Sequence, residues 1–156
     1  MSAIARLGSL LAVQKGRVDG AMAAVHERNG VLRQRELERQ AALERLEAAI
    51  VAYQLERKRL MESIENPRER HGGSGIQAAM LTGASLRCDA HRGWVAAAEK
   101  GLADVDELLA AASRAAMEAR ATYRRALARQ DALESLQASW KKAQGQRLLR
   151  LEEQEA

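Results

Sequence analysis

The 156-residue chain contains no Phe and only two Trp and two Tyr, whereas 29% of its residues are charged. This composition is rich in strong helix formers and poor in the bulky side chains that fill a thick globular core, so it favours long helices packed as a thin pair. The formal net charge of +4 arises from 25 basic and 21 acidic residues, and this near balance is weak evidence for a nucleic-acid partner.

The first apolar run, residues 7–13, is too short and too polar for a signal peptide. It contains Gly8 and Ser9 and leads directly into Lys15 and Arg17, so we interpret it as part of a helix. No stretch reaches the roughly 20 apolar residues that cross a bilayer, and we therefore expect no membrane insertion.

A first helix is predicted over residues 2–65, where one heptad repeat continues with few interruptions. Its a positions are Met22, Asn29, Glu36, Leu43, Ile50, Arg57 and Ile64, and its d positions are Leu11, Val18, Val25, Leu32, Arg39, Leu46, Tyr53 and Leu60. Each of the four glycines before residue 31 costs about 1 kcal/mol relative to alanine. We therefore expect the firmest packing between Leu43 and Ile64.

Residues 66–75 form the predicted linker. Pro67 disfavours the α conformation at Asn66, and three glycines follow between positions 72 and 75. Ser74 and Gln77 have the spacing of a capping box, so a second helix is predicted over residues 76–153.

This second helix has its own heptad repeat and is unusually rich in alanine. Its a positions are Leu81, Cys88, Val95, Leu102, Leu109, Ala116 and Tyr123, and its d positions are Ala84, His91, Ala98, Val105, Ala112, Ala119, Ala126, Leu133 and Trp140. If the linker folds the chain back, residues whose numbers add up to about 141 face each other, and large side chains of the first helix meet small ones of the second. The heptad repeats of the two helices, each assigned independently, are then both satisfied by one antiparallel pairing.

We therefore predict an all-α fold in which residues 1–156 form a single unit, two long helices in an antiparallel coiled-coil hairpin. In such a hairpin the core positions of each helix pack against those of the other helix of the same chain. The chain is therefore expected to be a monomer when isolated. An extended dimer, in which two chains pair their long helices, would satisfy the same heptads.

The sequence offers no convincing catalytic or metal site. Cys88 and His91 have the spacing of half a metal site, but both are predicted core positions and no second pair accompanies them. The glycines of residues 72–75 follow no strand and precede no Gly-Lys-Ser/Thr sequence, so a turn is favoured over a phosphate-binding loop. A two-helix rod has no concave wall that excludes water, and we expect no enzymatic activity, no cofactor and no small-molecule substrate.

A run of arginines in the second helix is the most suggestive charge feature. Its members are Arg114, Arg120, Arg124, Arg125 and Arg129, and only Glu118 interrupts them. The fold-back places Lys15 and Arg17 alongside, so this end of the hairpin is predicted to be positive. We interpret these seven residues as a docking surface for an acidic partner, with an ordinary solvated helix face as the alternative. The one aromatic residue among these arginines, Tyr123, is a predicted core position, so no aromatic side chain is expected there to stack on bases, which argues against single-stranded nucleic acid.

A basic chain of this size, with a long first helix, a short Pro/Gly break and a longer Ala/Arg/Glu/Gln-rich second helix, resembles the central-stalk proteins of type III secretion, the YscO and FliJ type with their Hrp relatives. The resemblance covers the whole chain and is architectural, because no diagnostic motif is matched. It implies a cytoplasmic protein, peripheral to a membrane-bound secretion apparatus, that sits in the pore of a hexameric export ATPase.

The same resemblance implies two further partners, an export gate protein and, for some members, export chaperones. The half containing Arg120, Arg124, Arg125 and Arg129 would be the ATPase-facing portion, and the region from Arg68 to His91 the gate-facing tip. Two other functions stay open: a generic coiled-coil scaffold or export-chaperone-binding protein, and, less favoured, a nonspecific nucleic-acid binder.

Overall fold

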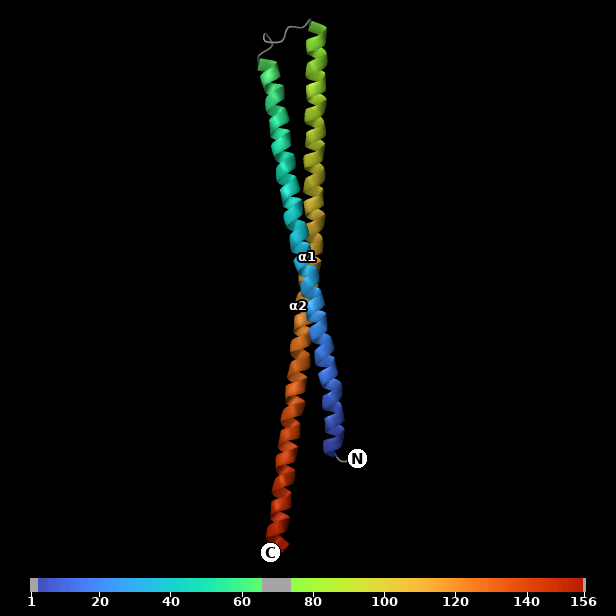
Figure 1. Ribbon diagram of the computed structural model, residues 1–156, viewed down its shortest axis with the longest axis vertical. Coiled ribbons are helices and arrows are strands. Elements are labelled where there is room, and N and C mark those ends of the chain that lie inside the picture. The colour runs from blue at the N-terminus through green and yellow to red at the C-terminus, as the bar shows by residue number, and fades with distance from the viewer. Residues whose placement is uncertain (1–2, 66–73, 156) are drawn as a thin grey trace. The chain divides into compact units, whose positions relative to one another are not determined.

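The computed structural model describes residues 3–65 and 74–155, and side chains from residue 78 onward in the second segment. It contains two helices, α1 (Ala3–Glu65) and α2 (Ser74–Glu155) (Figure 1). These bounds differ from the predicted ones by at most two residues. The predicted capping interaction of Ser74 with Gln77 and the linker residues 66–73 lie outside the described part of the chain.

The two helices pack against each other as a helical hairpin, so the predicted all-α fold is confirmed. Contacts between them pair Gln14 with Ala126 and Glu56 with Arg87. The numbers of both pairs add up to within about two residues of the predicted 141. The helices are therefore antiparallel, in the expected alignment.

The chain divides into two compact units, and each contains part of both helices. The first unit comprises Met1–Leu32 with Ala112–Ala156, and the second comprises Arg33–Ala111.

The buried apolar residues of the first unit are large on α1 and small on α2. Leu7, Leu11 and Val18 are buried on α1, and Ala112 and Ala116 are buried on α2. Ala116 is only 1% exposed, the lowest exposed fraction among the buried residues named here.

In the alignment set by Gln14 and Ala126, Leu11 and Val18 lie opposite Gln130 and Tyr123, so these buried residues do not face the buried alanines. The expected facing of large by small side chains stays a prediction.

The second unit is held by small buried residues and by ion pairs between the helices. Ala42, Ala84 and Cys88 are buried. Arg39 Nε donates to Asp106 Oδ1 over 2.7 Å, and Arg87 Nε lies 3.7 Å from Glu56 Oε2. The expectation that the firmest packing lies between Leu43 and Ile64 is not matched by burial, because the fully buried leucines and valine all belong to the first unit.

The predicted heptad repeat of α2 is confirmed from Leu81 to Leu133, where every assigned core position is buried or half-buried. Trp140, the last assigned position, is 39% exposed. In α1 the assigned d positions are also buried or half-buried, but the assigned a positions Met22 and Ile64 are 44% and 53% exposed.

The second core row of α1 lies one residue earlier than predicted. Its fully buried members are Leu7, Gln14, Ala42 and Ser63. In the corrected repeat these residues are d positions, and Leu11, Val18 and their successors are a positions. The error arose because alanine, glutamine and serine were not expected in the core, although a close approach of two helices selects small side chains.

Candidate partner-binding surface

An open groove crosses the seam of the first unit and brings three of the predicted basic residues together. It has a volume of about 360 Å³ and is lined by Gln14, Arg17, Ala21, Thr122, Arg125, Ala126 and Arg129. We call this the basic groove. Ala21 and Ala126 leave room at its centre, while Arg17 reaches it from α1 and Arg125 and Arg129 from α2.

The corrected heptad repeat explains why these arginines meet. Arg17 and Arg129 both occupy g positions, and in an antiparallel pair the g positions of the two helices flank the same side of the seam. Thr122 is the next g position of α2, one heptad before Arg129, and its hydroxyl accepts a 3.4 Å hydrogen bond from Arg125 Nη2.

The floor of the basic groove is fixed by a buried amide. Gln14 is 5% exposed, and its Nε2 donates to the backbone carbonyl oxygen of Ala126 over 2.9 Å. A buried amide without a partner would destabilise the fold, so this bond favours the alignment in which Gln14 faces Ala126. The alignment in turn sets Arg17 beside Arg125 and Arg129.

The three arginines of the groove carry uncompensated positive charge. All three are exposed, and none forms an ion pair with any side chain that the structure describes. An arginine guanidinium holds a carboxylate or phosphate through two parallel hydrogen bonds. Three of them around one hollow therefore form a surface that suits an acidic partner.

A second hollow of about 250 Å³ continues the basic groove along the same side of the seam. It shares Ala21 and Thr122 with the groove and is otherwise lined by Ala24, Arg28, Ala115, Glu118 and Ala119. Glu118, the one acidic residue in the arginine run, lies here with Arg28. The positive charge is therefore concentrated at the Arg17, Arg125 and Arg129 end.

The structure does not bring all seven predicted basic residues to one place. Lys15, Arg114 and Arg124 are exposed but line no part of the basic groove. Arg120 donates from Nη2 to Asn29 Oδ1 over 2.9 Å, and both residues occupy e positions, on the other side of the seam from the groove. The basic groove thus contains three of the seven predicted residues, Arg17, Arg125 and Arg129.

Sequence reasoning missed three polar residues of these hollows: Gln14, Thr122 and Arg28. Gln14 and Arg28 lie in the row of α1 that the predicted heptad left outside the core. Their spacing of two heptads, 14 residues, was a usable signal. Thr122 carries no charge, and nothing in the sequence around it indicated that it would line a hollow.

The second unit has two mostly apolar hollows close to the linker, and the residues that α2 contributes to them fall within Arg68–His91, the region likened to the gate-facing tip. One, of about 420 Å³, is lined by Leu60, Ile64, Leu81, Thr82, Ser85 and Leu86. The other, of about 570 Å³, is lined by Arg59, Ser63, Ala79, Met80, Gly83, Ala84 and Arg87. Met80 and Leu86 are 50% and 65% exposed, so apolar surface faces solvent around both hollows.

Cys88 and His91 occupy core positions, as predicted. Cys88 is buried, and His91 is half-buried with its ring 4.4 Å from that of Trp94 in an edge-on arrangement. The Nδ1 atom of His91 is buried and makes no hydrogen bond with the described residues. Among residues 3–65 and 74–155, no three His, Cys, Asp or Glu side chains gather as a metal site would require.

No protein-family model, curated protein or solved structure gives a significant match to this chain. Neither described helix is long and apolar enough to cross a membrane. The interpretation of function therefore depends on the hairpin and its surfaces.

Proposed function

We propose that this protein is a non-enzymatic central stalk of a type III protein secretion system, which binds the hexameric export ATPase and links it to the export gate. The observation that carries the proposal is the basic groove, in the unit that contains both ends of the chain, on a helical hairpin. In this proposal the export ATPase supplies the acidic side chains that Arg17, Arg125 and Arg129 bind.

The second unit supports the other half of the proposal. Apolar hollows bordered by exposed Met80 and Leu86 are suited to a partner that buries side chains there. The export gate protein would bind this unit, at a distance along the chain from the basic groove.

The ATP turnover of the export ATPase from the same organism tests the proposal. The protein is expected to raise the turnover of the ring at stoichiometric or lower amounts. The triple variant Arg17→Glu/Arg125→Glu/Arg129→Glu is expected to need at least about tenfold more protein for the same stimulation, because it turns attraction to acidic side chains into repulsion.

A matched variant controls for the change in net charge. Lys15→Glu/Arg114→Glu/Arg124→Glu alters the charge equally but leaves the basic groove intact, so its stimulation should stay within about threefold of the native chain. If the native chain leaves the turnover unchanged at every ratio tested, the proposed function is wrong. If both triple variants lose stimulation equally, the groove is not the ATPase-binding surface.

The apolar hollows also favour a second candidate function, a coiled-coil scaffold or export-chaperone-binding protein. Such a protein would capture an amphipathic helix at Met80 and Leu86 and have no effect on an ATPase. A Met80→Glu/Leu86→Glu variant that loses chaperone binding, in a protein whose native form does not stimulate the ATPase, would favour this function over the stalk.

A further inference from the structure

In the second unit, α2 carries a second heptad repeat beside the one that packs against α1. Its g and c positions from Met80 to Ala111 follow each other at spacings of three and four residues, the period of a coiled-coil seam. Gly83 is half-buried and the other nine residues are exposed. We call these ten residues the second face: Met80, Gly83, Arg87, Ala90, Trp94, Ala97, Gly101, Asp104, Leu108 and Ala111.

Large apolar side chains stand out from the second face at regular intervals. Met80, Trp94 and Leu108 are 14 residues apart and are 50%, 59% and 46% exposed. The ring of Trp94 contacts that of His91 edge-on at 4.4 Å, which holds the indole in place while most of it stays exposed. Of the other seven residues, five are alanine or glycine and only Arg87 and Asp104 are charged. Exposed apolar surface of this kind marks a protein interface.

The second face is complementary to itself when two copies run antiparallel. In the pairing where opposite numbers add up to 191, each g position meets a c position, as in an antiparallel coiled coil. The five pairs are Met80 with Ala111, Gly83 with Leu108, Arg87 with Asp104, Ala90 with Gly101, and Trp94 with Ala97. Every large apolar side chain thus meets a small one, and each charge meets its opposite.

The f positions of α2, which border the second face on the side away from α1, fit the same pairing. Lys100 lies opposite Gly93, and Glu107 lies opposite Leu86. No like charges are therefore opposed along this border.

The g positions of α1 border the second face on its other side. In the alignment of the hairpin, Glu38 lies level with Asp104, and therefore with Arg87 of the second copy. Arg45 and Arg59 lie level with apolar pairs. Like charges are thus kept apart on this border too.

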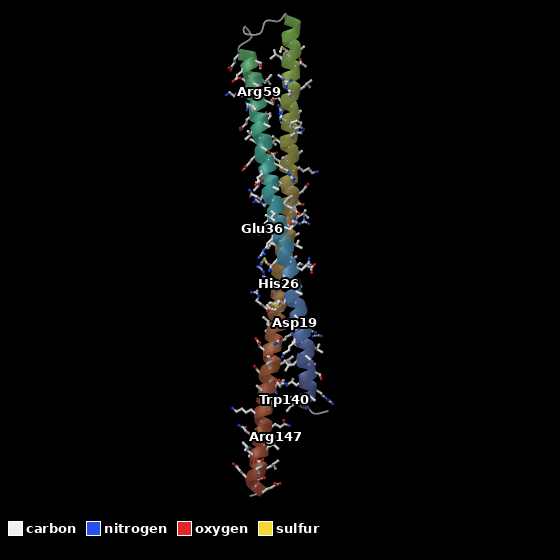
Figure 2. All side chains as sticks on the ribbon, in the orientation of Figure 1. Asp19, His26, Glu36, Arg59, Trp140 and Arg147 are labelled. Carbon is white, nitrogen blue, oxygen red and sulfur yellow. The ribbon has the colours of Figure 1, made fainter. Side chains whose placement is uncertain are left out.

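An open hollow lies where Leu108 of the second copy falls. It is the hollow of about 570 Å³ that Met80, Gly83 and Arg87 help to line, and Arg59 of α1 borders it (Figure 2). Gly83 has no side chain, and a Cβ there would lie 3.7 Å from Arg87 Nη1, an ordinary contact. The hollow therefore has room for a leucine side chain.

We infer that the second face is a self-association surface, through which α2 of one chain pairs antiparallel with α2 of a second copy. The interface is isologous, so one two-fold rotation closes it and no filament forms. It covers Met80, Trp94 and Leu108 of both copies. Each hairpin stays intact, because its own seam uses the a and d positions and no helix is exchanged.

The dimer does not depend on the proposed role with an ATPase. It differs from the monomer expected from the sequence, since that expectation considered only the heptads that the hairpin satisfies. A gate protein and a second copy would compete for the hollow beside Met80. The hollow lined by Leu60 and Ile64 lies on the other side of the seam and stays accessible in the dimer.

Charge reversal of the full-length chain tests the inference by sedimentation velocity at low salt. The contact is about 47 Å long and involves one helix of each copy, so we expect a micromolar dissociation constant and a titration to about 300 µM. Arg87→Glu and Asp104→Lys each oppose like charges at both ends of the interface. Each variant alone should dimerise at least about tenfold more weakly than the native chain.

An equimolar mixture of these two variants should dimerise within about threefold of the native chain, because every charge then meets its opposite. Positions 87 and 104 lie about 25 Å apart in one helix, so this rescue arises only between chains. It also shows that both variants fold. Two control variants, Glu47→Lys and Arg57→Glu, change exposed residues of α1 away from the second face and should dimerise like the native chain.

Spin labels report the direction of the pairing. In a Cys88→Ala background, labels at Gly93→Cys should lie within about 25 Å of each other in the dimer, whereas labels at Thr82→Cys should lie about 40 Å apart or more. A native chain that stays monomeric across the titration overturns the inference. So do single variants that dimerise undiminished, a mixture that fails to associate, control variants that lose dimerisation, and labels whose distances do not follow this order.

Discussion

Replacing Gln14 tests how the first unit is held together, because this residue is a buried polar group in an otherwise apolar seam. Gln14→Ala removes a hydrogen bond worth about 1 kcal/mol and the buried Cγ methylene group, worth about 0.8 kcal/mol. Alanine returns roughly 0.4 kcal/mol through its higher helix propensity. The free energy of unfolding should therefore fall by about 1.4 kcal/mol.

Gln14→Leu should behave differently although it removes the same hydrogen bond. Leucine fills most of the space of glutamine, and the carbonyl of Ala126 keeps the helical hydrogen bond that any interior carbonyl of α2 accepts four residues on. No buried group is then left without a partner, and apolar surface replaces a desolvated amide. We expect Gln14→Leu to be neutral or to stabilise the first unit by up to about 1 kcal/mol.

Urea denaturation followed by the fluorescence of Trp140 measures both effects, in a Trp94→Phe background so that only the first unit reports. Circular dichroism confirms that the variants stay helical before the transition. Equal destabilisation by Gln14→Ala and Gln14→Leu would refute the reasoning, because the hydrogen bond itself would then dominate over the space that the side chain fills.

Three further predictions concern positions where one physical effect dominates. Gly16 is helical with open space where a Cβ would lie, so Gly16→Ala should raise the free energy of unfolding by about 0.5–1 kcal/mol in the same assay. Ala116→Leu should lower the free energy of unfolding by about 1–3 kcal/mol, because Ala116 is 1% exposed and a larger side chain overpacks the site. Its control, Ala110→Leu on the exposed face of α2, should change the free energy of unfolding by less than about 0.5 kcal/mol. The hydrogen bond from Arg35 lowers the pKa of Glu38 below its usual 4.5. Arg35→Gln should therefore raise the titration midpoint of the Glu38 carboxyl, measured by carbon-detected NMR. An unchanged midpoint would contradict this cause of the pKa shift.

The lowered pKa of Glu38 also determines in which direction this residue makes the stability of the fold depend on pH. A carboxyl whose pKa is lower in the folded chain than in the unfolded one stabilises the fold above its unfolded pKa, and this contribution is lost as the pH falls through the folded pKa. Glu38 therefore contributes above about pH 4.5 and loses its contribution below it. The contribution is small because the pair with Arg35 lies at the surface.

The fold could be predicted because its signals are long and repeat many times. The Pro67 break separates two helices whose bounds differ from the predicted ones by no more than two residues, and the alanine-rich repeat of α2 is correct over more than seven heptads. The second core row of α1 could not be predicted in the same way. Ala42 and Ser63 are buried because α2 packs over them. Their burial depends on how the two helices pack together, which the sequence of α1 alone does not indicate.

The packing of the two helices also explains why the sequence predicted the arginine-rich stretch but not which of its arginines line the basic groove. Arginine content marked one stretch of α2 as positive, but which arginines meet depends on the side of the seam that each one flanks. A shift of one residue in the repeat of α1 moves Arg17 toward Arg129 and leaves Arg120 with Asn29 on the other side. Gln14 stabilises this alignment and lines the groove, so the residue that was least expected in the core also determines where the positive surface lies. A sequence argument that assigns core positions by hydrophobicity alone will misplace such a surface wherever two helices approach closely enough for alanine and glutamine to be buried.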